Sequence, residues 1–235
     1  MYLNPFIHRH NLHLLILEQI EQAFNNKPSI AGTLHGQRKI FQGCYGRRTA
    51  LFPSTKCNGS IPVESRLELA HAVSLEQDPN VKDFRTQSLK IQLSSCNFSY
   101  PDFLIETYDN NYEVHEVKPL ISSLSDKDLE RFERLSKIFD SIGIKFRLVD
   151  KNTLPSEECL QRLLYLYQRG HRYPWSPLEI DFALKHLQEH QFETINHVHA
   201  ALQVIGLKCE LAEYLLFHKR ITLLFKNSNF SQGDL

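Results

Sequence analysis

The sequence predicts an α/β protein in which a mixed β-sheet is flanked by helices and is followed by a small all-helical or winged-helix domain. Three observations indicate this fold. Residues 81–118 hold a series of segments with strand character, residues 125–150 read as a helix followed by a strand, and the patterns beyond residue 150 are helical. We expect a catalytic domain over residues 1–150 and a second domain over residues 151–235.

Two helices are expected before the sheet. Apolar residues recur at helical spacing over residues 12–24, and the run stops at Asn25, Asn26 and Pro28. The segment IPVESRLELAHAVSLEQDP, residues 61–79, predicts a second helix with Pro62 near its first turn and Asp78 at its end.

Segments with strand character follow, namely VKDFRTQ, LKIQL, DFLIETY and YEVHEVK, and the last two are expected to form a hairpin at residues 109–111. A helix then begins after Ser125, which is a good N-cap, and ends at Gly143. The strand IKFRLVD follows it. A hairpin followed by a helix and a strand forms a βαβ crossover, so the sheet should be mixed.

The second domain is expected to begin near residues 151–172. A helix over residues 155–170 is followed by three short helices, with Gly206 in a tight turn between the last two. The β-rich segment ITLLF, residues 221–225, comes after them. This order is typical of a winged helix-turn-helix.

Composition limits the location and the partners of the protein. The five cysteines are odd in number and never spaced as C-x-x-C, which argues against a disulfide framework or a structural zinc site. The H-E-x-x-H motif is absent, so the histidines are expected at the surface or at helix caps. The N-terminal apolar segment is too short for a membrane span. We expect a cytoplasmic protein without membrane association.

The net charge is zero, with 27 basic and 27 acidic residues, so overall electrostatics do not favour nucleic acid. The distribution of charge does favour nucleic acid, because residues 22–63 carry basic side chains and no acidic one. A solvated basic surface would explain this equally. The glycines of this stretch suggest an irregular loop that could follow phosphates, and the candidate DNA-binding residues are Arg38, Lys39, Arg47, Arg48 and Lys56.

One constellation of residues indicates chemistry. Pro101-Asp102 and Glu116-Val117-Lys118 are each the only match of their kind in the chain, and they lie on either side of the predicted hairpin turn. Alternation along a strand places Glu116 and Lys118 on one face, and Asp102 can sit opposite them. Converging carboxylates repel each other unless a hard cation such as Mg²⁺ lies between them. The alternative is an ordinary exposed hairpin in which Glu116 and Lys118 form ion pairs.

Such an ion, together with the ammonium of Lys118, would activate a water against a phosphodiester. The backbone carbonyl of Val117 is a further candidate ligand. A third acid could come from the preceding helix, where Glu64 and Glu68 lie one turn apart on the same face. The residues alone do not decide between Glu64 and Glu68 as the third acid.

The segments ESRLEL, FRTQ, YPDFLI and EVHEVKP resemble the PD-(D/E)xK nucleases, and more closely the TnsA endonuclease subunit of heteromeric transposases. The resemblance is strongest from about Phe52 to Lys151. It implies a restriction-endonuclease-like fold, with Glu68 as the helix acid, Asp102 as the main ligand of Mg²⁺ (or Mn²⁺ as a substitute), Glu116 as the second ligand and Lys118 as the catalytic lysine.

The resemblance also implies partners. TnsA-like subunits nick the 5′ ends of a mobile element while a DDE-type transposase cuts its 3′ ends, and an AAA+ ATPase regulates the pair. Two alternatives remain open. The protein could be a restriction, repair or junction-resolving nuclease of the same fold, or a DNA-binding or scaffold module in which Glu116 and Lys118 are merely paired.

Overall fold

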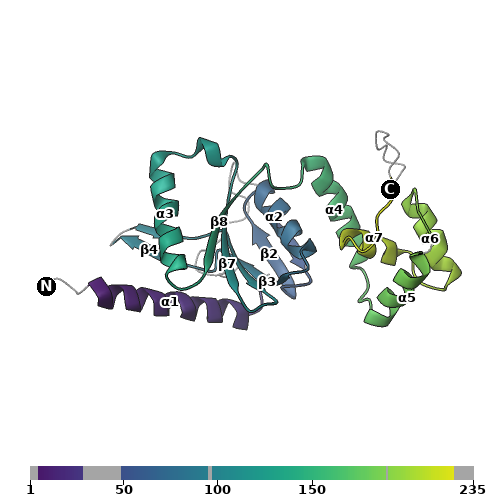
Figure 1. The fold of residues 1–235 in the computed structure, drawn as a ribbon, viewed down its shortest axis with the longest axis horizontal. Helices are drawn as coiled ribbons and strands as arrows, with labels where there is room; N and C mark the ends of the chain where they lie inside the picture. The colour runs from purple at the N-terminus through teal and green to yellow at the C-terminus, as the bar shows by residue number, and fades with distance from the viewer. Residues whose placement is uncertain (1–4, 29–48, 95–96, 189, 225–235) are drawn as a thin grey trace. The chain divides into compact units, whose positions relative to one another are not determined.

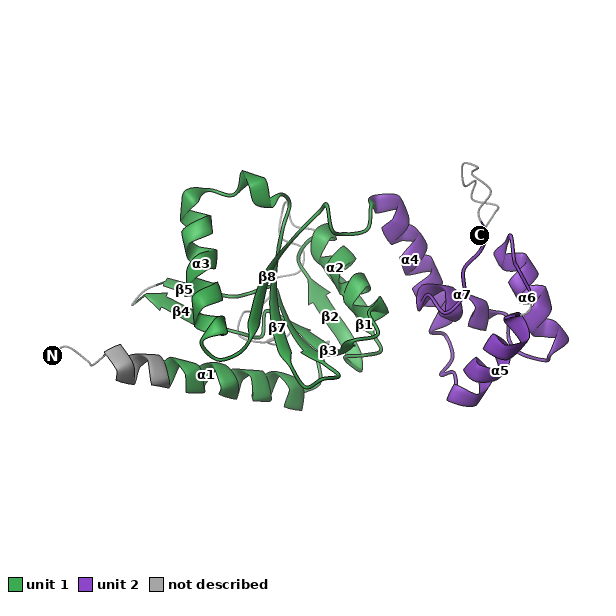
Figure 2. Cartoon of the chain, viewed as in Figure 1, with its two compact units in different colours: residues 1–156 green, residues 157–235 purple. Residues whose placement is uncertain are grey.

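A computed structural model describes residues 5–28, 49–94, 97–188 and 190–224 of the chain (Figure 1). The contacts divide the chain into two compact units, Met1–Ser156 and Glu157–Leu235 (Figure 2). The first unit is mixed α/β and the second is all-helical over its described residues. The division lies in the connection between the last strand of the first unit and the first helix of the second.

The centre of the first unit is a four-stranded sheet in the order β3 (Val81–Thr86), β6 (Phe103–Thr107), β7 (Tyr112–Lys118) and β8 (Lys145–Asp150). The β3–β6 and β6–β7 pairs are antiparallel, whereas β7 and β8 are parallel. The mixed sheet expected from the sequence is therefore confirmed.

The hairpin and the crossover follow the local signals of the sequence. Asn110 has a φ of 57° in the β6–β7 turn, a left-handed conformation that asparagine tolerates better than most residues. After the short 3₁₀ helix η1 (Ile121–Ser123), α3 (Asp126–Asp140) begins at Ser125, whose hydroxyl accepts from the backbone N–H of Asp128. Gly143, at a φ of 74°, ends the turn after α3 and leads into β8.

Helices cover both faces of the sheet, with α3 and α2 (Arg66–Gln77) on opposite sides of β7 in Figure 1. The core on the α3 side also takes in α1 (Pro5–Asn25). Its buried residues include Ile16, Ile20, Leu104, Val114, Phe132, Leu135 and Phe139. On the other face the ring of Phe103 meets that of His71 of α2, with centroids 4.8 Å apart. Since successive side chains of a strand point to opposite faces, β6 and β7 are buried on both sides.

The predicted start of α2 was wrong. Pro62 lies in β2 (Gly59–Val63), which pairs with β1 (Ala50–Ser54) as a separate antiparallel hairpin. The helix begins at Arg66 because the hydroxyl of Ser65 accepts from the N–H of Glu68. The end predicted at Asp78 is confirmed. A second small hairpin, β4 (Ile91–Ser94) with β5 (Asn97–Ser99), follows β3.

The second unit contains α4 (Glu157–Gly170), α5 (Pro177–Leu187), α6 (Ile195–Val204) and α7 (Glu210–Phe217). Gly206 has a φ of 76° in the turn between α6 and α7, as the sequence predicts. Residues 221–224 form no strand, and Phe225 lies outside the described residues. The all-helical region is confirmed, whereas the wing stays a prediction.

Two further expectations concern the chain as a whole. None of the helices within the described ranges is both long enough and apolar enough to cross a bilayer. The described cysteines Cys57, Cys159 and Cys209 are free thiols, and Cys44 and Cys96 lie outside the described residues.

Candidate active site

The predicted acidic residues of the hairpin meet at one end of the β6–β7 pair. Phe103 pairs with His115, so Asp102 and Glu116 are the next residues along these two strands. The backbone carbonyl of Asp102 also accepts from the N–H of Gln87, 3.0 Å away, after β3. The start of β6 is thereby fixed on both sides, and the position of Asp102 with it.

Asp102, Glu116 and Lys118 form a partly buried ionic cluster. The Lys118 Nζ lies 2.7 Å from Glu116 Oε1 and 3.9 Å from Asp102 Oδ2. The side chain of Glu116 is only 7% exposed, and that of Asp102 is 15% exposed. The backbone N–H of Val117 donates to Asp102 Oδ2 at 2.8 Å, and its carbonyl accepts from Lys118 Nζ at 3.1 Å. The ion pair between Glu116 and Lys118 that the alternative interpretation expected is present, but these side chains are largely buried and not part of an exposed hairpin.

The electrostatics of Asp102 show how crowded the negative charge is. Burial is the main cause that raises the pKa of Asp102, and together with the neighbouring carboxylates of Glu116 and Glu68 it brings this pKa from 3.8 to about 8, against the opposing effects of Lys118 and the Val117 N–H. A pKa displaced in this direction means that the ionised carboxylate lacks enough nearby positive charge. Perturbed acids of this kind are concentrated at functional sites.

Glu68 lies close enough to influence Asp102, but its own carboxylate is engaged at the start of α2. One oxygen accepts from the Glu64 N–H at 2.8 Å and the other from the Ser65 hydroxyl at 2.9 Å. Burial raises the pKa of Glu68. Across the residues that the structure describes, no three His, Cys, Asp or Glu side chains are arranged as ligands of one metal ion. The role of Glu68 as a third ligand therefore stays a prediction.

Asp102 and Glu116 nevertheless fit a divalent cation. The second carboxylate oxygen of Glu116, Oε2, is buried and has no hydrogen-bond partner within the described part of the chain. A buried carboxylate oxygen without a partner is costly, and a bound cation would offset that cost. Carboxylate oxygens are the ligands that Mg²⁺ prefers. These two residues could hold the ion, and the Lys118 ammonium lies beside them.

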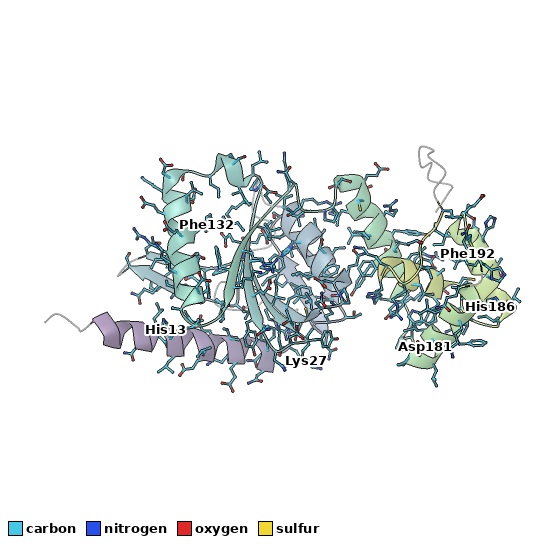
Figure 3. All side chains as sticks on the ribbon, in the orientation of Figure 1. His13, Lys27, Phe132, Asp181, His186 and Phe192 are labelled. Carbon is cyan, nitrogen blue, oxygen red and sulfur yellow. The ribbon has the colours of Figure 1, made fainter. Side chains whose placement is uncertain are left out.

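Arg131 is a member of this cluster that the sequence did not reveal. Its Nη2 lies 3.6 Å from Glu116 Oε1, and its guanidinium packs over the ring of Phe132 at 4.5 Å. Phe132, labelled in Figure 3, also lies 5.7 Å from the Lys118 ammonium. No pattern in the sequence separates Arg131 from Arg134 on the same helix. Only the packing of α3 on the sheet brings one of them to Glu116.

A buried histidine pair was also missed. His71 Nε2 and His115 Nδ1 are 3.0 Å apart, and His115 Nε2 is 3.0 Å from Glu113 Oε2. Burial lowers the pKa of His71 to about 3 and also lowers that of His115, so both rings are neutral near neutral pH. The pair joins α2, which carries Glu68, to the strand that carries Glu116. No pattern in the sequence pointed to this pair, because His71 and His115 are 44 residues apart along the chain.

The predicted DNA-binding residues are only partly described. Arg38, Lys39, Arg47 and Arg48 lie outside the described residues. The Lys56 ammonium donates to the backbone carbonyls of Leu75, at 3.0 Å, and Asp78 at the end of α2. Burial lowers the pKa of Lys56. Because its ammonium holds the end of a helix, we leave Lys56 out of the proposed DNA-binding surface.

The nuclease interpretation depends on the chemistry of Asp102, Glu116 and Lys118 and on the resemblance of the motifs around them. Neither a known protein family nor a curated protein sequence matches this chain at a significant level.

Proposed function

We propose that the protein is a Mg²⁺-dependent DNA endonuclease whose site is formed by Asp102, Glu116 and Lys118. The observation that carries this proposal is the buried cluster of these three side chains at the end of β6 and β7. The Lys118 ammonium is 2.7 Å from one Glu116 oxygen, while the other oxygen of that carboxylate is buried and finds no partner among the residues that the structure describes. Such a group is costly for stability, and it is useful where a cation and a phosphate are to be held.

Asp102 and Glu116 would hold the divalent ion, with Glu68 as a further candidate ligand. When bound, Mg²⁺ supplies a more acidic water and positive charge for the phosphate oxygens. The N–H of Val117 fixes one oxygen of Asp102 at 2.8 Å and so orients that carboxylate toward the site. Mn²⁺, which also prefers oxygen ligands, is expected to substitute.

The reaction is the hydrolysis of one phosphodiester bond. A water oxygen forms a bond to phosphorus, one ester P–O bond breaks, the water gives up a proton and the departing oxygen gains one. Negative charge grows on the phosphate oxygens during this step. The Lys118 ammonium is placed to stabilise that charge, which is the kind of electrostatic stabilisation that accounts for much of enzyme catalysis.

The biological role that we propose is the one implied by the TnsA resemblance: nicking of the 5′ ends of a mobile element together with a DDE-type transposase and an AAA+ regulator. The all-helical second unit could serve DNA or one of these partners. A chain without net charge is expected to bind DNA weakly by itself, because nonspecific affinity comes from the neutralisation of phosphates. Positioning by the transposase would compensate for this weakness.

The test is strand nicking of DNA with Mg²⁺ or Mn²⁺, on supercoiled plasmid with the chain alone and on element-end DNA with the transposase present. We expect Asp102→Asn and Lys118→Ala to lower the nicking rate by at least about a hundredfold, the usual effect of removing an electrostatic contact made in the transition state. Glu133→Gln is the matched control, since Glu133 is an exposed carboxylate of α3 paired with Lys137.

Both variants must first be shown to fold, by circular dichroism. If folded Asp102→Asn and Lys118→Ala nick DNA as fast as the wild type, the nuclease proposal is wrong. A DNA-binding or scaffold role would then account better for the cluster. Equal nicking by the Glu133→Gln control and the wild type is required for the loss to be assigned to the site.

A further inference from the structure

Two cations, not one, face Glu116 in this structure. Lys118 comes from the same strand, and Arg131 comes from α3 on the same face of the sheet. Arg131 Nη2 is 3.6 Å from Glu116 Oε1 and also 3.6 Å from Asp128 Oδ1. Direct N–H···O hydrogen bonds are about 2.7–3.2 Å long. Both contacts of Arg131 are therefore ion pairs that stop short of a hydrogen bond.

The guanidinium of Arg131 has hydrogen-bonding capacity to spare. Its Nε is buried and has no hydrogen-bond partner among the described residues. An arginine carries five N–H donors, and leaving one of them buried and unpaired is unfavourable. The packing of the guanidinium over the Phe132 ring, at 4.5 Å, holds its plane in place. Arg131 thus has a fixed orientation, and its side chain is 35% exposed, so the terminal Nη2, held by ion pairs alone, stays within reach of a ligand.

Neither acid beside Arg131 accounts fully for its position. The Asp128 carboxylate is 42% exposed, so water screens its attraction for Arg131, and its other oxygen accepts from the Ser125 hydroxyl at 2.7 Å. Glu116 is already in close contact with Lys118. Two ionised carboxylates neutralise one divalent ion. The charges of Lys118 and Arg131 would then be left to attract another anion.

We propose that Arg131 binds a backbone phosphate of the DNA strand held at Asp102, Glu116 and Lys118. This inference rests on the proposed nuclease function and names a substrate-binding residue for it. Arginine suits the task because its planar fork matches two oxygens of one phosphate, whereas lysine offers a point charge. Before DNA binds, Arg131 stays near Glu116. When DNA binds, a phosphate pairs with the terminal N–H groups of the guanidinium.

The test measures DNA affinity, so it does not depend on cleavage. A fluorescein-labelled duplex is titrated with the full chain, and fluorescence anisotropy is followed in Ca²⁺, which also takes oxygen ligands, and separately in EDTA. The variants are Arg131→Gln and Arg131→Lys. Arg134→Gln is the matched control, because it removes the same charge from the same helix at an exposed position paired with Glu130.

In Ca²⁺ we expect Arg131→Gln to weaken binding about tenfold relative to Arg134→Gln, the effect of losing one charge-assisted hydrogen bond. Arg131→Lys should fall between the two. In EDTA the Gln variants should be alike, because Arg131 then remains with Glu116. If Arg131→Gln matches Arg134→Gln in Ca²⁺, including the case in which neither binds measurably, the inference is overturned.

The outcomes also separate this inference from the nuclease proposal. Suppose that Asp102→Asn loses nicking but Arg131→Gln binds and nicks DNA as well as the control. This result refutes only the role of Arg131. Equal nicking by the wild type and Asp102→Asn refutes the nuclease function itself. If Arg131→Gln fails to fold, the DNA affinity of Arg131→Lys, which keeps the positive charge over Phe132, still tests the inference.

Discussion

Replacing Asp102 by asparagine should stabilise the metal-free protein, and the gain should grow with pH. Burial, with the neighbouring carboxylates of Glu116 and Glu68, raises the pKa of Asp102 from 3.8 to about 8, so the folded protein keeps this proton at pH values where the unfolded chain has lost it. The stability from this group is fully present below about pH 3.8 and is lost progressively as the pH rises to about 8. Asparagine has no proton to lose and can still accept from the Val117 N–H.

The size of the effect follows from the displacement of the pKa. One unit of pKa corresponds to about 1.4 kcal/mol, so the cost of Asp102 in the wild type reaches about 4 kcal/mol at pH 7. The side chain is only 15% exposed, and solvent therefore screens little of this cost. Asp102→Asn should gain about that much in free energy of unfolding between pH 4 and pH 7, or about 10 °C in melting temperature.

The assay is urea unfolding followed by circular dichroism, for wild type and Asp102→Asn, at about pH 4 and about pH 7 in EDTA. The comparison removes the contributions that both proteins share, such as that of His71. The effect of His71 on stability has the opposite dependence on pH. Burial lowers the pKa of His71 to about 3, so the free energy of unfolding that this residue contributes is lost as the pH falls below 6.5. A difference between the two proteins that does not change with pH would refute the reasoning. Mg²⁺ should stabilise the wild type more than the variant.

Two predictions concern other parts of the fold. Glu76 is fully buried and accepts from hydroxyl and amide donors of the β1–β2 loop, so Glu76→Gln should lower the free energy of unfolding by about 2 kcal/mol in urea titrations, while the exposed Glu133→Gln stays close to wild type. A Cβ on Gly170 would lie 2.5 Å from the backbone nitrogen of Tyr214, where α4 meets α7. Gly170→Ala should therefore cost about 3 kcal/mol or more in the unfolding of the second unit. At Gly206 a Cβ meets open space and only the positive φ opposes it, so Gly206→Ala should cost about 1 kcal/mol. Equal stability of the two glycine variants would contradict the assigned cause.

Local signals determined most of the sheet and its helices. Ser125 and Gly143 set the ends of α3, the residues at 109–111 set the hairpin, and alternation put Glu116 and Lys118 on one face. Each of these features depends on residues a few positions apart, which is why the sequence alone could predict them. The sequence also predicted that Asp102 would lie opposite Glu116, because the short turn fixes the register of the hairpin.

Local sequence patterns gave a wrong prediction where a residue suited two kinds of secondary structure equally well. Pro62 suits the first turn of a helix, but it also suits a strand that needs no N–H at that position, and pairing with β1 decided the matter. Ser65 was the better cap and lay only three residues on. Residues 221–224, Ile-Thr-Leu-Leu, form no strand although the sequence has β character there. Propensity for β structure depends on having a partner strand, and the sequence does not reveal whether one is present.

The sequence by itself determined that an acid after a proline, an acid and a lysine would lie on one hairpin, since spacing and alternation are local properties. Only the tertiary structure decided that Arg131 rather than Arg134 reaches Glu116 and that His71 contacts His115. The same holds for the Glu68 carboxylate, which accepts a hydrogen bond at the start of its own helix. These contacts join elements that are distant along the chain. The packing of α2 and α3 on the two faces of the sheet determines these contacts. The same packing buries Asp102 and so raises its pKa.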